Sequence, residues 1–276
     1  MFTLNCKGRL LVIDKPIVMG IINITPDSFY KSSRIQQADA LLEKVSSLIS
    51  QGASILDMGG QSTRPGSEFL LADEEMRRII PAIELVHKHF PEAVISVDTF
   101  WSSVAKEAVG AGASIINDIS AGSIDPKMYE TVAKLGVPYV LMHMKGNPQN
   151  MQQNPVYENL VTEVLDFFIT QTAKLKAAGV NDIIIDPGFG FGKTVEQNFL
   201  LFKNMDSFKM LDCPLLVGIS RKSMVTRTLE ISAMNALNGT TVLNTLGLLH
   251  GADILRVHDV KETIEAIRIC DAYLSA

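Results

Sequence analysis

The chain has 276 residues, of which 47% are hydrophobic and 20% are charged, so it can bury one large core within a single domain. A formal net charge of -5 and a pI near 5.6 argue against a duplex nucleic-acid binder, which needs a basic stripe to neutralise phosphates. No apolar run is long enough to cross a bilayer, and residues 1–14 lack the uninterrupted apolar segment of a signal peptide. We therefore expect a cytoplasmic protein that binds small molecules and neither nucleic acid nor membrane.

Short β-branched runs alternate with amphipathic stretches along the chain, which is the pattern of a parallel sheet covered by helices. Residues 3–14 predict a β-hairpin, because Lys7-Gly8 is a turn signal between two apolar runs. Apolar residues at helical spacing predict helices that include 73–89 and 157–178. Eight further strands are expected, at 17–22, 54–58, 94–97, 114–117, 139–142, 183–186, 215–218 and 254–257.

Eight parallel strands are the number that closes a barrel. The predicted fold is an α/β protein of the (β/α)8 TIM-barrel class, one domain over 1–276, with an N-terminal β-hairpin in 1–16 that closes the bottom. In this fold the C-terminal ends of the strands meet at one mouth, where catalysis is built. Nearly every predicted strand ends in a polar or glycine-rich group, so we expect the site at that mouth.

The first two strands end in groups that suit charged ligands. Asn23 offers an amide oxygen that can ligate a hard cation or contact phosphate, although its surroundings also fit a plain turn. The next group, GGQSTRPGS, combines small residues with Arg64, whose guanidinium matches phosphate oxygens. An anion loop and a flexible connection are equally good interpretations of that group alone.

The third and fourth strands place Asp98 and Asn117 at neighbouring positions on the rim. Acidic residues at such positions often cap helices, and capping is the main competing role for Asp98 and Asp118. Asn117 closes an apolar strand and is expected to point inward. His143 follows the fifth strand without a second His or a carboxylate at ligand spacing, so a packing role is predicted.

The sixth strand ends in DPGFGFGK, which differs from a nucleotide P-loop because Pro187 occupies the first glycine position of that pattern. Asp186 is instead followed by a glycine-lined surface with Phe191, which suits a flat ring beside an acid that accepts hydrogen bonds. The loops after the last two strands are the usual phosphate site of this fold. Here they supply Ser220, Lys222, Arg256 and His258.

Eight segments, taken in order, resemble those of dihydropteroate synthase over residues 18–260. They are MGIINITPDSF, LDMGGQSTRPGSE, SVDTF, INDISAG, LMHMKGNP, DPGFGFGK, GISRKS and RVH. The resemblance implies a transferase of folate biosynthesis that condenses (7,8-dihydropterin-6-yl)methyl diphosphate with p-aminobenzoate, giving 7,8-dihydropteroate and diphosphate. It also implies Mg²⁺ as cofactor and a homodimer.

The same resemblance implies a role for each residue at the mouth. The pterin is expected to meet Asp98, Asn117, Ile119, Met142, Asp186, Gly190, Phe191, Gly218 and Lys222. The diphosphate is expected to meet Asn23, Arg64, Arg256 and His258, with Mg²⁺ reaching Asn23. The p-aminobenzoate pocket is expected to consist of Thr63, Pro65, Phe191, Ser220 and Lys222. The residues expected to act in catalysis are Asp98, Asp186, Lys222 and Arg256.

The implied reaction forms a C–N bond at the pterin methylene after the C–O bond breaks, which spreads positive charge into the ring. Mg²⁺ and the cationic residues would stabilise the departing diphosphate, while Asp98 and Asp186 would favour positive charge on the pterin. An aromatic amine attacks in its neutral form, so no strong general base is expected.

The chain departs from the family pattern at two places. Tyr30-Lys31-Ser32-Ser33 stands where the family usually has Ser-Asp-Gly-Gly, which bears on closure of the first loop, and Gln61 stands where relatives often have Glu. Three other functions remain open. They are a methyltetrahydrofolate-corrinoid methyltransferase-like domain, which needs no diphosphate site, a Schiff-base aldolase with Lys222 as nucleophile, and a non-catalytic pterin-binding homologue.

Overall fold

A computed structural model describes residues 1–24, 34–61, 70–146, 151 and 155–276, in which eight parallel strands form one sheet. The strand order is β8-β7-β6-β5-β4-β3-β10-β9, and a bridge between Ile185 and Leu215 brings the two ends of the sheet together into a barrel. The predicted strands are confirmed to within one residue at each end. They are β3 (Ile17–Asn23), β4 (Ile55–Gly59), β5 (Val94–Asp98), β6 (Ile115–Asp118), β7 (Tyr139–Met142), β8 (Ile183–Asp186), β9 (Leu216–Val217) and β10 (Ile254–Val257).

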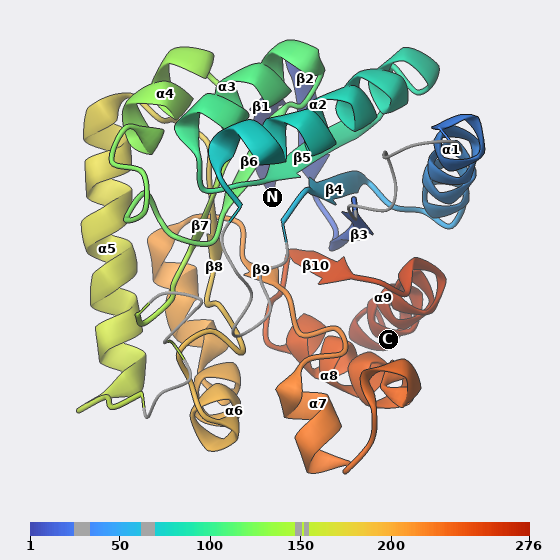
Figure 1. Cartoon of the computed structure of the whole chain (residues 1–276). Coiled ribbons are helices and arrows are strands. Elements are labelled where there is room, and N and C mark those ends of the chain that lie inside the picture. The colour runs from blue at the N-terminus through green and yellow to red at the C-terminus, as the bar shows by residue number, and fades with distance from the viewer. Residues whose placement is uncertain (25–33, 62–69, 147–150, 152–154) are drawn as a thin grey trace.

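Helices surround the strands, as the ring of coiled ribbons in Figure 1 shows. None of the helices within the described residues is long and apolar enough to span a membrane. The α-helices are α1 (Arg34–Ser50), α2 (Ala72–His89), α3 (Ser102–Ala111), α4 (Met128–Leu135), α5 (Leu160–Ala178), α6 (Val195–Lys203), α7 (Ser223–Thr228), α8 (Leu237–Leu249) and α9 (Val260–Leu274). Two short 3-10 helices, η2 (Met205–Leu211) and η3 (Ala233–Asn235), follow α6 and α7.

Local sequence suits the two ends of α2 and explains where α5 begins. Helix α2 carries acidic residues in its first turn and basic residues in its last turn, which complements the helix dipole. Helix α5 begins at Leu160, three residues later than predicted. Asn159 caps it, because the Asn159 side-chain oxygen accepts a hydrogen bond from the backbone N–H of Thr162 at 3.2 Å. The prediction that Tyr157 begins this helix was therefore wrong.

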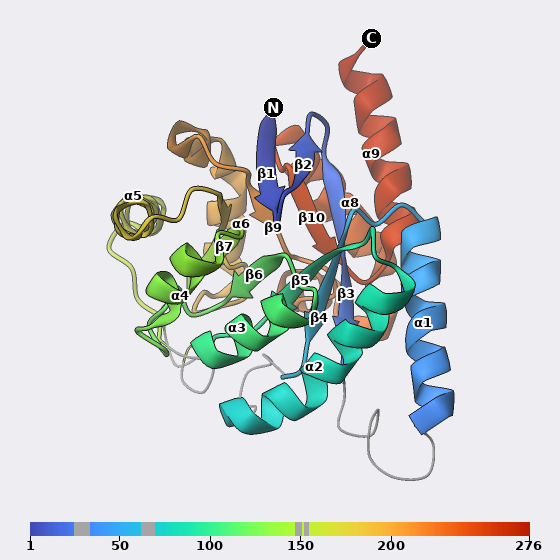
Figure 2. The ribbon, with the colours of Figure 1, turned by 90° about the horizontal axis from the view of Figure 1, so that it is seen from above.

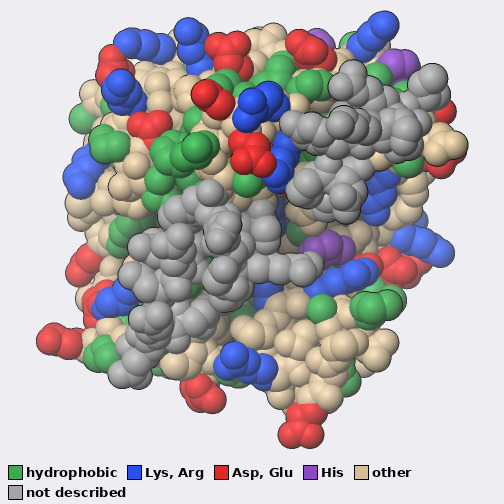
Figure 3. Space-filling view, viewed as in Figure 1, with side chains coloured by type: hydrophobic (Ala, Val, Ile, Leu, Met, Phe, Trp, Pro, Cys, Tyr) green, Lys and Arg blue, Asp and Glu red, His purple; other side chains and the backbone are tan. Residues whose placement is uncertain are grey.

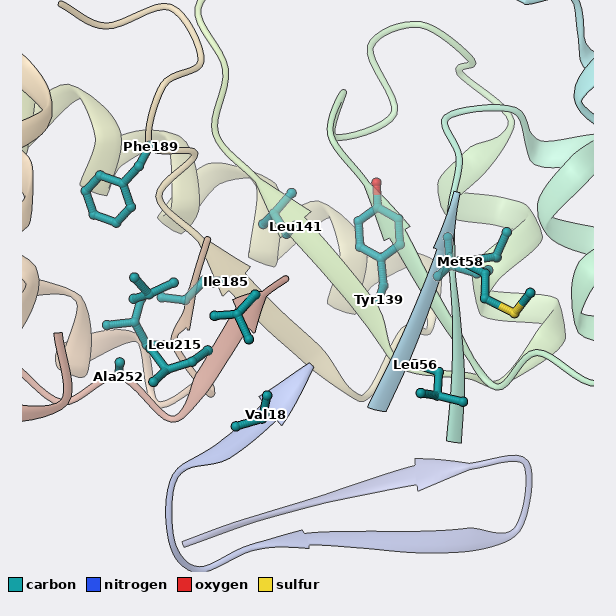
Figure 4. Close-up of a cluster of buried hydrophobic side chains, with 14 of the residues drawn as sticks. Val18, Leu56, Met58, Tyr139, Leu141, Ile185, Phe189, Leu215 and Ala252 are labelled. Atoms are coloured by element: carbon teal, nitrogen blue, oxygen red, sulfur yellow. The ribbon is translucent and has the colours of Figure 1, made fainter. Parts of the chain in front are cut away.

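The core has two layers that alternate along each strand. One set of side chains faces outward and packs against the helices, and Figure 4 shows part of it, including Val18, Leu56 and Leu141. The other set faces the barrel interior. Its lowest layer takes one apolar residue from each strand: Met19, Ile55, Val94, Ile115, Val140, Ile184, Leu216 and Ile254.

The N-terminal hairpin covers that lowest layer. Strands β1 (Phe2–Cys6) and β2 (Arg9–Ile13) pair antiparallel, and Leu4, Cys6 and Ile13 pack against the interior residues. Figure 2 shows the hairpin at the end of the barrel opposite the C-terminal ends of the strands. The predicted hairpin and its place at the bottom are thus confirmed.

Truncating the covering face of the hairpin is expected to destabilise the whole barrel. Ile13 is 2% exposed and Leu10, on the same strand, is 64% exposed. We expect Ile13→Ala to lower the free energy of unfolding by about 2–5 kcal/mol, because it leaves a cavity in the lowest layer. Leu10→Ala is the matched control and should change that free energy by no more than about 0.5 kcal/mol. Urea unfolding of both variants measures the difference, and equal effects would contradict the packing described.

Candidate active site

Period-two alternation places a second, mostly polar layer directly above the apolar floor of the barrel. On each strand this layer lies two residues beyond the lowest interior residue, so it faces the same interior. Its members are Ile21, Asp57, Ser96, Asn117, Met142, Asp186, Gly218 and Arg256. Figure 3 shows Lys, Arg and His side chains gathered around the hollow in the middle of the face where these strands end.

Arg256 joins two buried carboxylates across the barrel. Its Nε donates to Asp57 Oδ2 at 2.7 Å and its Nη2 donates to Asp98 Oδ2 at 2.8 Å. Asp57 also accepts hydrogen bonds from Ser96 Oγ at 2.6 Å and from Asn117 Nδ2 at 3.1 Å. The guanidinium therefore connects β4, β5 and β10 in one network of charge-assisted bonds.

Burial and ion pairing have opposite effects on the pKa values of Asp98 and Arg256. Burial raises the pKa of Asp98 to about 7, against the opposing effect of Arg256. Burial alone would lower the pKa of Arg256, but the carboxylates of Asp57 and Asp98 outweigh it and raise that pKa above its usual value. Arg256 therefore stays charged, and Asp98 titrates close to neutral pH.

A second charged group lies at the ends of β8 and β9. Asp186 Oδ1 accepts the backbone N–H of Gly188 at 2.8 Å, and burial raises the pKa of Asp186 while Lys222 opposes that shift. Lys222 Nζ donates to the carbonyl of Phe189 at 2.8 Å and lies 4.6 Å from the centroid of the Phe191 ring. Burial lowers the pKa of Lys222 to about 8, with Asp186 acting in the opposite sense.

An apolar wall stands beside these charges. It consists of five buried residues that pack together at the mouth: Phe100, Ile119, Met142, Met151 and Phe191. Gly190 and Gly218 face Lys222, and a methyl group at Gly190 would lie 3.4 Å from Lys222 Cδ. A planar, polar heterocycle fits such a site, because one edge meets carboxylate and ammonium groups while its faces meet apolar side chains.

The opposite rim holds an open cavity of about 370 Å³, lined by Ile21, Ile22, Asn23, Lys44, Arg221, His258 and Asp259. His258 Nδ1 lies 3.0 Å from Ser220 Oγ. Burial, together with the nearby Arg221 and Arg256, lowers the pKa of His258 to about 4, so its ring is neutral at physiological pH. The cavity thus offers an amide, the Lys44 ammonium, the Arg221–Asp259 ion pair and a neutral imidazole to a ligand.

The chain was compared with known proteins. A model of the pterin-binding enzyme family matches residues 19–258. Dihydropteroate synthase of Escherichia coli K12 is 42% identical over 275 residues, covering 99% of this chain and 97% of that protein. The chain belongs to the dihydropteroate synthase family.

Solved structures of the same family share the fold over the whole length. Yersinia pestis dihydropteroate synthase in a sulfonamide drug complex is 40% identical, with a TM-score of 0.93 and complete coverage of both chains. Xanthomonas albilineans dihydropteroate synthase in complex with 7,8-dihydropteroate is 34% identical, with a TM-score of 0.86 and 99% coverage of each chain. The TIM-barrel prediction is confirmed by these similarities and by the closed order of the strands.

The structure brings most of the predicted dihydropteroate synthase residues together. Asp98, Asn117, Asp186, Lys222 and Arg256 meet in the polar layer or just above it, and Ile119, Met142 and Phe191 meet in the apolar wall. Asn23 and His258 line the open cavity. The predicted residues Thr63, Arg64 and Pro65, and the unusual segment 30–33, lie outside the described residues.

The packing role predicted for His143 is borne out, but the helix-capping role considered for Asp118 is not, because α4 begins at Met128 with no side-chain cap. Asp118 accepts the backbone N–H groups of Ser120 at 2.7 Å and Gly122 at 2.9 Å, together with the hydroxyl of Tyr139 at 2.7 Å. It therefore holds a turn. His143 is buried, and its ring packs edge-on against Phe167 with centroids 4.9 Å apart.

Asp57 is the charged residue of the polar layer that the sequence predictions missed, and Ser96, Phe100 and Met151 were not predicted either. Asp57 lies inside β4 instead of at its end, and it is fully buried. A signal was present, because one carboxylate within the apolar run ILDMG must find a partner when the strand is buried on both faces. Gln61, which replaces the usual Glu, accepts the backbone N–H of Leu70 at 3.2 Å.

Proposed function

We propose that the chain condenses (7,8-dihydropterin-6-yl)methyl diphosphate with p-aminobenzoate, releasing diphosphate and forming 7,8-dihydropteroate. The observation that carries this proposal is the buried Asp186 carboxylate beside Lys222 and the apolar wall, in a member of the dihydropteroate synthase family. A pterin has a ring N–H next to an amino group, and one carboxylate can accept both. Asp186 would bind that edge, with Asn117 and Lys222 at the other polar atoms.

The remaining pterin contacts follow from the shape of the mouth. Met142, Ile119 and Phe191 would lie against the ring faces, while Gly190 and Gly218 leave room for the ring to approach Lys222. Asp98 would face the part of the ring that becomes positive when the C–O bond breaks. Its carboxylate already accepts from Arg256, so its charge is held in position before substrate binds.

Arg256, His258 and Asn23 would receive the diphosphate, joined by Arg64 as the family resemblance implies. Arg256 is permanently charged, and the neutral His258 offers a ring N–H donor instead of a second full charge. These groups stabilise the negative charge that gathers on the leaving diphosphate. The arriving amine of p-aminobenzoate is neutral, so the site needs no strong general base.

Magnesium is proposed as the cofactor on the chemistry of the donors. Asn23 presents an exposed amide oxygen at the open cavity, and such hard oxygens, with phosphate oxygens and water, form a typical Mg²⁺ site. Among the described residues there is no cluster of three or more His, Cys, Asp or Glu side chains that could hold a metal alone. Asn23 therefore fits an ion that enters with the substrate, and Mg²⁺ would neutralise charge on the departing diphosphate.

The p-aminobenzoate site is proposed between Phe191, Ser220 and Lys222, with Thr63 and Pro65 completing it as the family resemblance implies. Ser220 Oγ accepts the backbone N–H of His258 at 3.3 Å, which fixes the serine at the border between the mouth and the cavity. Lys222 can contact both substrates from its position over Phe191. This arrangement would bring the amine to the pterin methylene on the side opposite the diphosphate.

The pH dependence of kcat/KM should reflect Asp98 and Lys222. Asp98 is required as the carboxylate, so activity is expected to fall below its pKa of about 7, and Lys222 is required as the ammonium, so activity is expected to fall above its pKa of about 8. We expect a bell-shaped profile with its maximum between these values. Residue 98 no longer titrates in Asp98→Asn, so the fall in kcat/KM at low pH should lose the part that Asp98 causes. An unchanged fall in kcat/KM at low pH would contradict this assignment.

We also propose that residues 1–276 act as one domain and assemble as a homodimer through α8. This helix has no charged residue, and its outward side presents Val242, Leu246 and Leu249 to solvent. Such an apolar face on a cytoplasmic protein fits a second copy of the chain. Val242→Asp/Leu246→Asp should convert a dimer into a monomer in sedimentation velocity, whereas Leu200→Asp, at an exposed position on α6, should not.

A cytoplasmic location is part of the proposal. Cys6, Cys213 and Cys270 are all free and buried, as expected for a protein that folds in a reducing compartment.

Three assays separate the proposed reaction from the alternatives. The purified chain should convert the pterin diphosphate and p-aminobenzoate to dihydropteroate in the presence of Mg²⁺, and EDTA should stop this conversion. A methyltransferase-like domain would instead transfer a methyl group from methyltetrahydrofolate, and an aldolase would leave a borohydride-stable adduct on Lys222. Pterin binding without any conversion would identify a non-catalytic homologue.

A further inference from the structure

Lys193 is a buried lysine that the proposed reaction does not use. Its residue is only 2% exposed, and its Nζ points into the protein behind the loop that follows β8. No salt bridge to Lys193 is found among the described residues, so its Nζ is held by other polar groups. Burial lowers the pKa of Lys193 to about 7, against the opposing effect of Asp186, and an amine buried this deeply is costly unless its donors find acceptors.

The acceptors around Lys193 Nζ come from two segments of the chain. Three are backbone carbonyl oxygens, those of Gly188 at 3.0 Å, Phe191 at 3.1 Å and His143 at 3.3 Å. The fourth is His143 Nδ1 at 2.9 Å. Burial lowers the pKa of His143 well below its usual value, so the ring is neutral and can accept from Lys193 Nζ. Lys193 thus connects residues 188–191 to the end of β7.

The loop of residues 187–192 packs closely against residues 143–145, which follow β7. A methyl group at Gly188 would lie 1.9 Å from the carbonyl oxygen of His143, and one at Gly192 would lie 2.4 Å from that of Lys145. Both glycines also have positive φ, at 67° and 62°. The loop backbone therefore contacts the 143–145 segment directly, and Lys193 binds the two together.

The same loop supplies the contacts that hold Lys222. The backbone carbonyl of Phe189 accepts a hydrogen bond from Lys222 Nζ at 2.8 Å. The centroid of the Phe191 ring lies 4.6 Å from the same nitrogen. Two lysines therefore bind different carbonyls of one loop. Lys193 takes those of Gly188 and Phe191, and Lys222 takes that of Phe189.

We propose that Lys193 is a positioning residue for the pterin site. By fixing the carbonyls of Gly188 and Phe191 it sets where the Phe191 ring and the Phe189 carbonyl meet Lys222. The inference rests on the proposed function, because it assigns the pterin to this side of the mouth. The inference also makes a prediction of its own, namely that Lys193 affects binding of the pterin and not of diphosphate. The reason is that the cavity with Asn23 and His258 does not include the loop.

Lys193→Met tests this role, because methionine has a similar length and lacks both charge and donors. Binding of 6-hydroxymethylpterin and of inorganic diphosphate with Mg²⁺ is measured by calorimetry on the folded variant. We expect the Kd of the pterin to rise roughly tenfold or more and that of diphosphate to change by less than about twofold. Lys15→Met is the control for loss of a lysine, since the Lys15 ammonium contacts Asp271 at 2.9 Å and not the loop, and it should leave both constants unchanged.

The outcomes separate this inference from the proposed function. Failure of the wild-type chain to bind the pterin overturns the proposed function, whereas equal pterin affinity in wild type and Lys193→Met overturns only the positioning role. A lower melting temperature with unchanged pterin affinity shows a merely structural lysine. If Lys193→Met does not fold, Tyr157→Phe removes the hydroxyl that donates to the Gly192 carbonyl at 2.7 Å and so loosens the same loop. Weaker pterin binding in that variant supports the inference, and unchanged binding overturns it.

Discussion

Replacing Arg256 with alanine is expected to lower kcat/KM on the order of 10³-fold, which corresponds to the loss of a preorganised charge at the leaving group. The same change should lower the free energy of unfolding by about 3–5 kcal/mol, because it leaves the buried carboxylates of Asp57 and Asp98 without their shared cation. Steady-state kinetics and urea unfolding measure the two effects on one preparation.

Arg78→Ala is the matched control for this prediction. The Arg78 side chain is 16% exposed and that of Arg256 is 18% exposed, and Arg78 pairs with Glu74 on the surface of α2. Arg78→Ala should leave kcat/KM within about twofold of wild type. Adding Asp57→Asn to Arg256→Ala should return part of the lost stability by removing an uncompensated charge, without restoring activity. Wild-type turnover in Arg256→Ala would contradict the role assigned to the guanidinium.

Asp186→Asn is expected to have the second large effect, with kcat/KM reduced on the order of 10³-fold. Asparagine keeps the size of the side chain and the acceptor for the Gly188 N–H, so the loop should remain in place. It replaces the other carboxylate oxygen with an amide donor, which would face a donor on the pterin. The loss should appear in the Kd of the pterin as well as in turnover.

Asp182→Asn provides the control on the same segment of chain. Asp182 lies at the opposite end of β8, where Asp182 Oδ2 accepts the backbone N–H of Asn5 from the hairpin. An asparagine oxygen can keep that bond, so pterin affinity and turnover should remain at the wild-type level. Equal losses in Asp182→Asn and Asp186→Asn would show that general damage to β8, and not pterin recognition, explains the result.

The strands and their order were predictable because each is a short apolar run followed by a polar group. The run at 183–186 matches β8, and alternation from Ile184 to Asp186 already places the carboxylate inside the barrel. The N-terminal hairpin was equally clear from the Lys7-Gly8 turn between apolar runs. These features depend on residues that are neighbours in the sequence, so a sequence pattern can predict them.

Features that depend on partners distant in sequence were not predictable in the same way. Asp57 acts through Arg256, which is 199 positions away, and Lys193 acts through His143, which is 50 positions away. The glycine-rich segment before Lys193 resembles a phosphate loop, yet its lysine points into the core and binds carbonyls. The folded arrangement agrees with the prediction of Lys222 at the mouth, and it shows that Lys193 lies behind the loop.

The most direct test of the proposed reaction follows the oxygen that bridges the pterin methylene and the diphosphate. The purified chain is incubated with p-aminobenzoate, Mg²⁺ and pterin diphosphate that carries ¹⁸O at this bridge, and both products are analysed by mass spectrometry. We predict one labelled diphosphate for each dihydropteroate formed, because the C–O bond breaks and the amine takes its place. Label retained on a hydroxymethylpterin, or diphosphate released without dihydropteroate, would contradict the proposed function.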